Sequence, residues 1–312
     1  MFAPANIALC KYCGKRDEEL NLPLTSSLSV SLGALGTHTT LSLDPAGDTI
    51  ILNDHPLPAQ SRFALSATRY LDLFRPTPQT FFRLRTRNTV PTAAGVASSA
   101  SGFAALALAL NDLFEWDLGR RDLSILARLG SGSACRSVYD GFVEWHAGSE
   151  ANGMDSCAEP MTETWPDLRL GLIHVSTTPK DIGSRSAMRQ TRETSALYES
   201  WPRKVAQDID LVKDAIRCGD FERFGRVAES NALAMHAIAL AAWPPILFWL
   251  PESVAVMRRI WAQRAGGLEV YFTMDAGPNV KLLFRAKDTA RVEAAFPGVE
   301  ITAPFPDRAP PG

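Results

Sequence analysis

The sequence predicts an α+β protein built from two domains. The chain has 312 residues, roughly twice the ~150 residues of an average domain. Strand patterns dominate its first hundred residues, and helical patterns dominate from Ser98 onward, with further strands among them. Because strands and helices are mixed without strict alternation, an α+β arrangement is favoured over a doubly wound parallel sheet.

The first hundred residues contain short segments in which apolar and small polar residues alternate. Residues 28–32 read Leu-Ser-Val-Ser-Leu, which is the two-residue period of a strand. Asn53-Asp54 separates two short apolar runs and predicts a hairpin turn. We expect strands at residues 24–32, 37–43, 49–52, 55–57 and 80–87. A helix is expected at 62–74, where large apolar residues recur at helical spacing.

The rest of the chain is richer in helical patterns. Residues 98–116 are rich in Ala and Leu and free of Pro, which predicts a buried helix. Residues 204–217 show the clearest amphipathic spacing. Further helices are expected at 122–129, 221–241, 252–264 and 288–296, and strands at 141–145, 168–175, 268–273 and 280–284. We expect the domain boundary near 170–185, which divides the chain into 1–178 and 179–312.

The charge balance excludes partners that bind by bulk attraction. Lys and Arg number 32 and Asp and Glu number 34, so the formal net charge is −2. Proteins that hold nucleic acid or anionic membranes in this way are usually strongly basic, so neither partner is expected. The most apolar stretch, 237–250, is interrupted by two prolines and is shorter than the ~20 residues that span a bilayer. The first 15 residues lack the pattern of a secretory leader.

The cysteines and histidines do not predict a metal site. Five cysteines are scattered along the chain, and only Cys10 and Cys13 form a C-x-x-C pair. A second pair would be needed for a typical zinc site. The five histidines share no ligand spacing. We therefore expect reduced thiols, a cytoplasmic protein and no bound transition metal.

A run of small residues at 91–102 leads directly into the predicted buried helix. Small side chains let a phosphate approach backbone N–H groups, and a helix N-terminus adds free donors. Gly95, Ala97, Ser98, Ser99 and Ser101 are the candidate contacts. The alternative is a flexible loop before a buried helix.

Three other segments carry cations beside small residues. Lys11 and Lys15 flank a Tyr and a Gly, and would share one face if a strand continued through them; solvated lysines at a strand end are the alternative. Residues 130–137 place Arg136 after Gly and Ser residues, where a guanidinium can grip a carboxylate or phosphate. Residues 178–185 offer Lys, Ser and Arg, or else a plain surface loop.

One acid, Asp275, stands at a strand end in a Gly-Pro turn. In that position it is either a catalytic carboxylate or a cap for the turn. An acid together with several loops rich in cations and hydroxyls suits phosphoryl transfer, in which positioning and charge neutralisation provide most of the catalysis.

Taken in order, these motifs resemble the diphosphomevalonate decarboxylase family of the GHMP kinase superfamily, from the N-terminus to about residue 285. The residues that carry the resemblance are 6–8, 11–17, 20–27, 91–102, 130–137 and 274–279. The resemblance implies a GHMP kinase fold with the active site between two domains. The N-terminal domain would be like domain 2 of ribosomal protein S5, and the C-terminal domain would be α+β.

The resemblance also implies the reaction. ATP, with Mg²⁺ held mostly by its phosphates, would phosphorylate the tertiary 3-hydroxyl of (R)-5-diphosphomevalonate. Loss of phosphate and CO₂ would then give isopentenyl diphosphate and ADP in isoprenoid biosynthesis. Such a carboxy-lyase needs this phosphorylation because an alkyl acid has no electron sink until a good leaving group departs from its β carbon. A homodimer is also implied.

The family's functional residues map onto this sequence one by one. Asp275 would act on the 3-hydroxyl, as base or as orienting group; Lys11 would stabilise the transferring phosphoryl group; Arg136 would hold the carboxylate. The remaining matches are diphosphate contacts at Tyr12, Lys15, Ser184 and Arg185, substrate-region serines at Ser131 and Ser133, and ATP-phosphate contacts at Gly95, Ala97, Ser98, Ser99 and Ser101. The adenine pocket is expected between Arg62 and Arg87.

Two departures from the family widen the range of possible activities. Cys13 stands where the family usually has Trp, and Cys157 lies where it commonly has Tyr. Both changes replace a large aromatic ring with a small thiol, so a 5-monophosphate substrate is an alternative to the diphosphate. The sequence is also compatible with a small-molecule kinase that stops after phosphorylation and with a non-catalytic nucleotide-binding protein.

Overall fold

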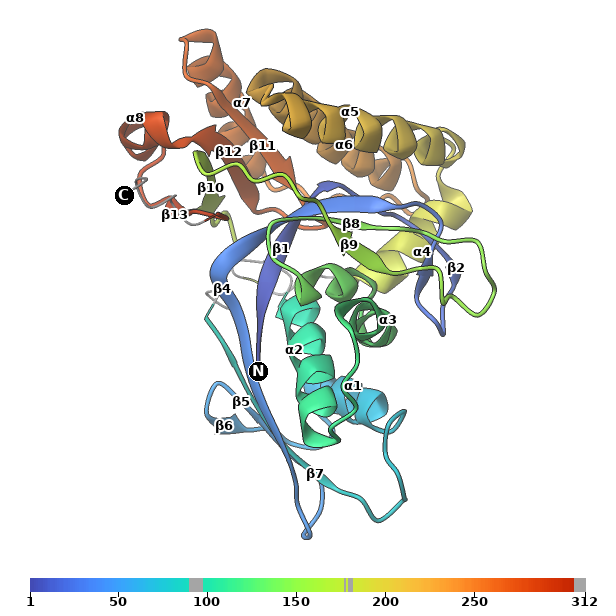
Figure 1. The fold of residues 1–312 in the computed structure, drawn as a ribbon. Coiled ribbons are helices and arrows are strands. Elements are labelled where there is room, and N and C mark those ends of the chain that lie inside the picture. Colours follow the sequence, from blue (N-terminus) through green and yellow to red (C-terminus); the bar gives the residue numbers. More distant parts are fainter. Residues whose placement is uncertain (90–97, 177, 179–181, 306–312) are drawn as a thin grey trace.

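A computed structural model of the chain describes residues 1–89, 98–176, 178 and 182–305. Gly95, Ala97 and Lys180 lie outside the described residues, as does the side chain of Ser98. The described part contains a seven-stranded sheet, a four-stranded sheet and a two-stranded hairpin, with helices packed against the two larger sheets (Figure 1).

The larger sheet is organised around one long strand. Strand β4 (Ser27–Leu43) pairs antiparallel with β1, β7 and β8, and the strand order is β6-β5-β7-β4-β8-β9. The two strands predicted at 24–32 and 37–43 are thus a single bent strand. The other members are β1 (Phe2–Cys10), β5 (Thr49–Leu52), β6 (His55–Pro56), β7 (Phe82–Asn88), β8 (Phe142–Trp145) and β9 (Ala158–Pro160).

Strand β1 carries the chain into the functional region. It packs between α2 (Ser98–Leu113) and the helices α5 (Trp201–Cys218) and α6 (Phe221–Leu240), so almost all of it is buried. Burial on both faces explains its sequence, which is apolar except for Asn6 and lacks the alternation of a half-exposed strand. Ile7 and Leu9 belong to the main hydrophobic core, whereas Asn6 and Ala8 line a cavity.

The second sheet is antiparallel, with the order β11-β12-β10-β13. Its strands are β10 (Leu168–Ile173), β11 (Val270–Met274), β12 (Val280–Arg285) and β13 (Glu300–Thr302). Strand β10 precedes the expected boundary at residue 178 but pairs with strands from the end of the chain. The division of the chain at residue 178 stays a prediction. By strand pairing, β10 belongs to the sheet of the second half, although it precedes that residue.

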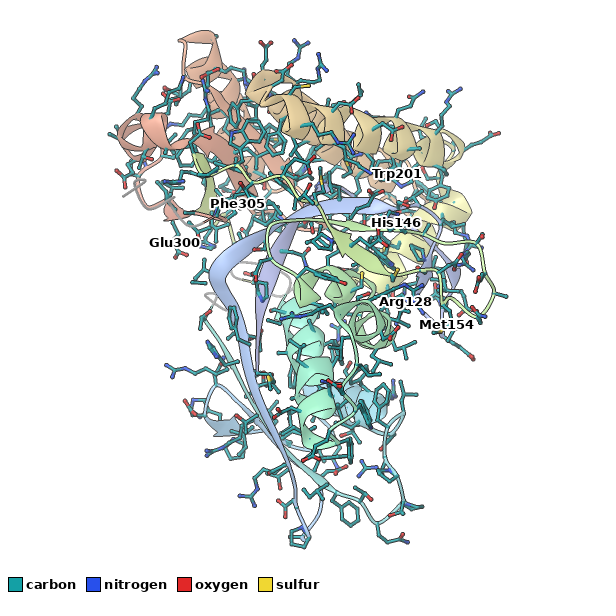
Figure 2. All side chains as sticks on the ribbon, viewed as in Figure 1. Arg128, His146, Met154, Trp201, Glu300 and Phe305 are labelled. Atoms are coloured by element: carbon teal, nitrogen blue, oxygen red, sulfur yellow. The ribbon has the colours of Figure 1, made fainter. Side chains whose placement is uncertain are left out.

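One hydrophobic core joins the two halves. Phe224 of α6 is fully buried and packs on Phe142 of β8 at a ring distance of 6.1 Å. The same cluster includes Leu170 from the second sheet and Trp201 at the start of α5 (Figure 2). Because both sheets share this core, loops from distant parts of the sequence are held in a fixed relation.

Every predicted helix is present, with shifted ends. Helices α1 (Arg62–Leu71), α3 (Arg120–Gly130), α7 (Pro251–Ala265) and α8 (Thr289–Ala295) correspond to predicted ones. Trp243 is 76% exposed and Trp261 is 40% exposed. Among the described residues, none of the helices combines the length and apolar character that crossing a membrane requires.

Some elements were not predicted. Helix α4 (Ser184–Thr194) and the 3₁₀ helix η2 (Gly132–Val138) occupy segments interpreted as loops. Both begin among Gly and Ser residues, which have weak helical propensity. Other short elements are the hairpin strands β2 (Lys15–Asp17) and β3 (Leu22–Pro23) and the 3₁₀ turns η3 (Tyr198–Ser200) and η4 (Ala286–Asp288).

The shared core makes Phe224 a test of how the two halves are joined. Replacing Phe224 with Ala removes a fully buried ring, and we expect the free energy of unfolding to fall by about 3–5 kcal/mol. Chemical denaturation followed by tryptophan fluorescence measures this loss. The control Leu73→Ala changes a side chain that is 60% exposed and should stay within about 0.5 kcal/mol of the parent protein. Equal effects of the two substitutions would contradict the assignment of this core.

Candidate active site

A cavity of about 1100 Å³ lies where the two halves meet. Its walls come from the end of β1, from α1 and α2, from the loop after α3, from the first turns of α4 and from the turn after β11. The predicted site residues that line it are Lys11, Tyr12, Lys15, Ser99, Ser131, Ser133, Arg136, Ser184, Arg185 and Asp275. Folding therefore brings together residues from five separate motifs.

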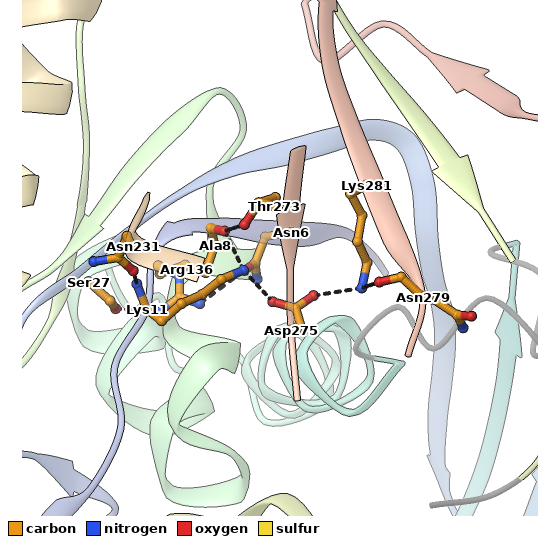
Figure 3. Close-up of polar contacts among 10 residues, drawn as sticks. All are labelled: Asn6, Ala8, Lys11, Ser27, Arg136, Asn231, Thr273, Asp275, Asn279 and Lys281. Atoms are coloured by element: carbon orange, nitrogen blue, oxygen red, sulfur yellow. Dashed lines mark hydrogen bonds and ion pairs between the residues drawn. The ribbon is translucent and has the colours of Figure 1, made fainter. Parts of the chain in front are cut away.

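Asp275 lies between two lysines at one side of this cavity (Figure 3). Its Oδ1 is 2.8 Å from Lys11 Nζ, and its Oδ2 is 3.1 Å from Lys281 Nζ. Both lysine side chains are only 3% exposed, and that of Asp275 is 28% exposed. Lys281 was not predicted as a site residue, although a lysine within the apolar strand Val-Lys-Leu-Leu-Phe was a signal.

The electrostatics of this group follow from burial and charge. Burial by itself would raise the pKa of Asp275, but the ammonium groups of Lys11 and Lys281 outweigh it and hold that pKa well below its usual range. Burial lowers the pKa of Lys11 to about 8, although Asp275 acts in the opposite direction. Asp275 is thus a firmly ionised carboxylate, and Lys11 is an ammonium that loses its proton more readily than an ordinary lysine.

A chain of polar contacts fixes Lys11 from behind. Its Nζ donates to the carbonyl oxygen of Ala8 at 2.7 Å, and its backbone N–H donates to Asn231 Oδ1 at 2.8 Å. The amide of Asn231 in turn donates to Asp208 Oδ2 at 2.7 Å, and that carboxylate pairs with Lys204. Strand β1 ends at Cys10, so Lys11 and Lys15 are not successive residues of one strand face, and their positions depend on such contacts instead.

Arg136 is the second buried cation of the site. It is 2% exposed, and it donates to Ser27 Oγ at 2.6 Å and to Asn6 Oδ1 at 3.1 Å. Its Nε is buried and has no partner among the described atoms. A buried guanidinium with only neutral partners has charge available for an anion, which agrees with the carboxylate contact expected from the sequence.

Tyr12 lies against the loop that follows α3. Its ring packs edge-on against Trp145 at 4.9 Å, and a Cβ on Gly132 would come within 2.9 Å of its hydroxyl oxygen. A larger residue at this position would therefore displace the ring of Tyr12 or of Trp145. Burial raises the pKa of Tyr12 to about 12, so the phenol stays protonated and can donate a hydrogen bond beside Ser131 and Ser133.

A second group of cations lines the cavity around Lys15. Its Nζ donates to Asn21 Oδ1 at 2.6 Å and lies 3.4 Å from Glu18. Burial and the positive charge of Arg185 lower the pKa of Lys15. Arg185 donates to the carbonyl oxygen of Gly130 at 3.0 Å, and Ser184 begins α4 with no acidic residue in its first turn. An anion here would relieve repulsion between the two cations and meet a helix N-terminus.

The two positions that depart from the family pattern have different surroundings. Cys13 lines the cavity and is 5% exposed. Tyr198 donates to its carbonyl oxygen at 2.6 Å, so an aromatic ring from η3 covers this loop. Cys157 is buried and does not belong to the described residues that line the cavity.

The predicted phosphate contacts on α2 divide between two faces of the helix. Ser99 lines the cavity, whereas Ser101 is fully buried and its hydroxyl lies 2.7 Å from that of Thr37. Two helical positions apart means about 200° of rotation, so Ser101 faces the sheet. The prediction of Ser101 as a direct nucleotide contact is corrected accordingly. Ser98 starts the helix.

The cavity continues between α1 and β7, the region in which we expected an adenine pocket. Phe63 and Ser66 of α1, Thr86 of β7 and Phe103 of α2 contribute to its wall. Among the described residues, no group of three or more His, Cys, Asp or Glu side chains is placed to hold a metal ion. Protein groups that can accompany a phosphate-bound cation are the Ser99 hydroxyl and the Asp275 carboxylate.

Comparison with known proteins gives a consistent result over most of the chain. The family described as diphosphomevalonate decarboxylase-like N-terminal domain matches residues 3–158. The family described as mevalonate 5-diphosphate decarboxylase C-terminal domain matches residues 172–301. The diphosphomevalonate decarboxylase of Aspergillus fumigatus is 38% identical over 319 residues, covering 95% of this chain and 79% of that protein.

Solved structures agree with these matches. The complex of MDDEF with MVAPP, AMPPCP and magnesium is similar with a TM-score of 0.91 and 40% identity, covering 96% of this chain and 94% of the other. Mevalonate diphosphate decarboxylase from Staphylococcus aureus has a TM-score of 0.91 and 37% identity, covering 96% and 93%. These similarities confirm the predicted α+β fold of the GHMP kinase class.

The coupling between Lys11 and Asp275 is directly measurable. In Asp275→Asn, we expect the pKa of Lys11 to fall below about 8, because the carboxylate that favours its ammonium form is lost while burial and the neighbouring cations remain. A ¹³C NMR titration of the lysine Cε groups would report this pKa. Glu144→Gln removes a different lysine partner, that of Lys213, and should leave Lys11 unchanged. A Lys11 pKa that stays constant or rises in Asp275→Asn would contradict the coupling.

Proposed function

The chain belongs to the diphosphomevalonate decarboxylase family, and we propose that it converts (R)-5-diphosphomevalonate and ATP to isopentenyl diphosphate, ADP, phosphate and CO₂. The observation that carries this proposal is the Asp275 carboxylate held between Lys11 and Lys281 in a cavity that also contains Arg136. The reaction belongs to the mevalonate pathway of isoprenoid biosynthesis.

The first chemical step is phosphorylation of the tertiary 3-hydroxyl. In this proposal Asp275 accepts a hydrogen bond from that hydroxyl and orients its oxygen toward the γ-phosphorus. Its pKa, held well below the usual range, makes it a weak base, which fits a loose transition state that needs little proton removal before the P–O bond forms. Lys11 moves its ammonium onto the transferring phosphoryl group and offsets the charge there.

The second step is fragmentation of the phosphorylated intermediate. The electron pair of the bond to the carboxylate carbon becomes the new C=C bond, CO₂ departs, and the phosphate leaves with the electrons of the C3–O bond. Arg136 is the group proposed to hold the carboxylate, because it is buried and its partners among the described residues are the neutral side chains of Ser27 and Asn6. Holding the carboxylate in place sets up the alignment that fragmentation needs.

The 5-diphosphate is proposed to bind near Lys15 and Arg185, with donors from Tyr12 and Ser184. Burial and the charge of Arg185 lower the pKa of Lys15, and two neighbouring cations suit a ligand end with more negative charge than a monophosphate. Ser131 and Ser133 line the intervening wall. The two positive charges of Lys15 and Arg185 are the reason to favour the 5-diphosphate over the 5-monophosphate, although Cys13 replaces the aromatic ring that the family usually has.

ATP is proposed to lie along the other arm of the cavity. Its phosphates would meet Ser99 and the start of α2, with Gly95, Ala97 and Ser98 from the preceding loop, and its base would lie between α1 and β7. Mg²⁺ would arrive with ATP, held chiefly by the phosphates, and would neutralise the charge that develops during transfer. A related structure contains AMPPCP, an ATP analogue, together with magnesium.

The cellular setting is likewise a proposal. Five unpaired cysteines, four of them buried, support a reducing compartment and so a cytoplasmic enzyme. The exposed large apolar side chains of Trp243 and Leu247 support an association between two copies of the chain, since such surfaces often mark interfaces.

The reaction can be tested with purified protein, ATP, Mg²⁺ and 5-diphosphomevalonate labelled with ¹⁴C at the carboxylate. We expect labelled CO₂ and ADP in equal amounts. Asp275→Ala should lower turnover by at least about 1000-fold, because the transferring hydroxyl loses its orienting carboxylate, and should leave ATP binding measurable by calorimetry. The matched variant Asp214→Ala changes an exposed acid on α5 and should retain full activity.

Each competing function would give a distinct result in the same assay. ADP without CO₂ would favour a small-molecule kinase, and faster turnover of the 5-monophosphate would favour a phosphomevalonate decarboxylase. No turnover of either substrate would favour a non-catalytic nucleotide-binding protein. Undiminished activity of Asp275→Ala would refute the role given to this carboxylate.

The diphosphate contact gives a separate prediction. Arg185→Gln should raise KM for 5-diphosphomevalonate by about 10- to 100-fold with a smaller change in kcat, because it removes a charged contact far from the reacting carbon. The ratio of kcat/KM for the 5-diphosphate to kcat/KM for the 5-monophosphate should fall by a similar factor. Arg189→Gln, one turn further along α4 and exposed, is the matched control. If both variants behave like the parent enzyme, Arg185 does not bind the diphosphate.

A further inference from the structure

Lys281 is the one member of the Asp275 group that the proposed reaction leaves without a task. It lies on β12 opposite Thr273 of β11, and its side chain is 3% exposed. Its Nζ is 3.1 Å from Asp275 Oδ2, and the carbonyl oxygen of Asn279 lies 3.4 Å from the same atom (Figure 3). A lysine is almost never this buried unless its charge is paired, so the position requires Asp275.

The two lysines divide the carboxylate between them. Lys11 occupies Oδ1 and Lys281 occupies Oδ2, and they approach from different elements, the end of β1 and the start of β12. Lys11 lines the cavity, whereas Lys281 is not among the described residues that do so. One ammonium therefore faces the ligand space, and the other lies behind the carboxylate.

This arrangement matters when a phosphoryl group arrives. The Lys11 ammonium has three N–H donors, two of which serve the Ala8 carbonyl oxygen and Asp275 Oδ1, so drawing it toward a phosphoryl group weakens its contact with Oδ1. A buried carboxylate that loses its only partner is strongly destabilised. If Lys11 were that only partner, it would stay bound to Asp275. Because Lys281 remains on Oδ2, the carboxylate keeps one partner when Lys11 moves away.

We propose that Lys281 is a positioning residue: it holds Asp275 in place through Oδ2 and frees Lys11 to move from Oδ1 to the transferring phosphoryl group. The inference rests on the proposed function and extends it to a residue that does not touch the substrate. Lys281 acts only through Asp275.

The charges around Asp275 determine how the loss of Lys281 would change the pKa values of Asp275 and Lys11. The groups that face this carboxylate are Lys11 from the end of β1, Lys281 from β12, Arg136 from η2 and His236 from α6. Burial lowers the pKa of His236 to about 3, so its ring is neutral near pH 7. Loss of the Lys281 charge raises the pKa of Asp275, because its anion is less stabilised, and raises the pKa of Lys11, because its ammonium is less repelled.

The kinetic test compares Lys281→Met with the conservative Lys281→Arg. We expect Lys281→Met to lower kcat by about 100-fold while KM for 5-diphosphomevalonate changes by less than about 3-fold. The basic limb of its pH profile of kcat/KM, which Lys11 sets, should move to higher pH. Lys281→Arg should restore most of kcat and the position of this limb. Lys213→Met, which removes a lysine paired with Glu144 outside the cavity, should behave like the parent enzyme.

A structural role alone predicts a different result. In that case Lys281→Met would lose thermal stability and its basic pH limb would stay in place, which would overturn the proposal. Should Lys281→Met fail to fold, Lys281→Gln offers a polar but shorter side chain without the charge, and the same shift of the basic limb is expected. Unchanged kcat in a folded variant would also overturn it.

A second measurement does not depend on turnover. A double-mutant cycle of Lys281→Met and Asp275→Asn, followed by urea unfolding, isolates the pairing from other effects. We expect Lys281→Met to cost clearly less stability in the Asp275→Asn background than in the parent. Additive effects would overturn the pairing itself. If no CO₂ is formed but the cycle shows coupling, the proposed function fails and the pairing of Lys281 with Asp275 stands.

Discussion

The ion pair between Lys11 and Asp275 is the contact on which the site depends. The two residues are 264 positions apart in sequence, one at the end of β1 and the other after β11. Their 2.8 Å separation requires a common core that fixes the position of one sheet relative to the other. Phe224, Phe142 and Leu170 supply that core, and the polar contacts of Asn231 fix the backbone of Lys11 from α6. Packing and electrostatics therefore support the same pair from two directions.

The positive charge of the cavity is local. The whole chain carries a formal charge of −2, yet Lys11, Arg136 and Lys281 surround a single carboxylate, and Lys15 and Arg185 form a second positive region. Burial makes the charges of Lys11, Lys15, Arg136 and Lys281 more effective because water screens them less. Burial also makes unpaired charge costly. The neutral side chains of Asn6, Ser27 and Asn21 stabilise the buried cations by accepting hydrogen bonds from them.

The sequence predicts those parts of the site in which a local pattern carries the chemistry. Lys11, Arg136 and Asp275 each stand in a distinctive run of residues and all line one cavity. Lys281 and Asn231 lie inside regular elements, where a polar residue looks like any other until its partners are known. Ser101 shows the opposite error, because a serine in a promising motif faces the sheet once helical rotation is taken into account. The fold class could be predicted from the periodicity of apolar residues. Helix α4 could not be predicted in this way, because its sequence is mostly polar and lacks a stripe of large apolar residues.

The same cations must serve two steps with opposite demands. Phosphoryl transfer is favoured by positive charge near the 3-oxygen, but fragmentation develops positive charge on the adjacent carbon, which nearby cations oppose. The departing phosphate resolves this conflict if it stays beside Lys11, because its negative charge then screens the carbon from the ammonium. Asp275, kept ionised by Lys281, adds a second negative charge on that side. In the proposed reaction this charge balance favours loss of CO₂ while the cleaved phosphate still lies beside Lys11.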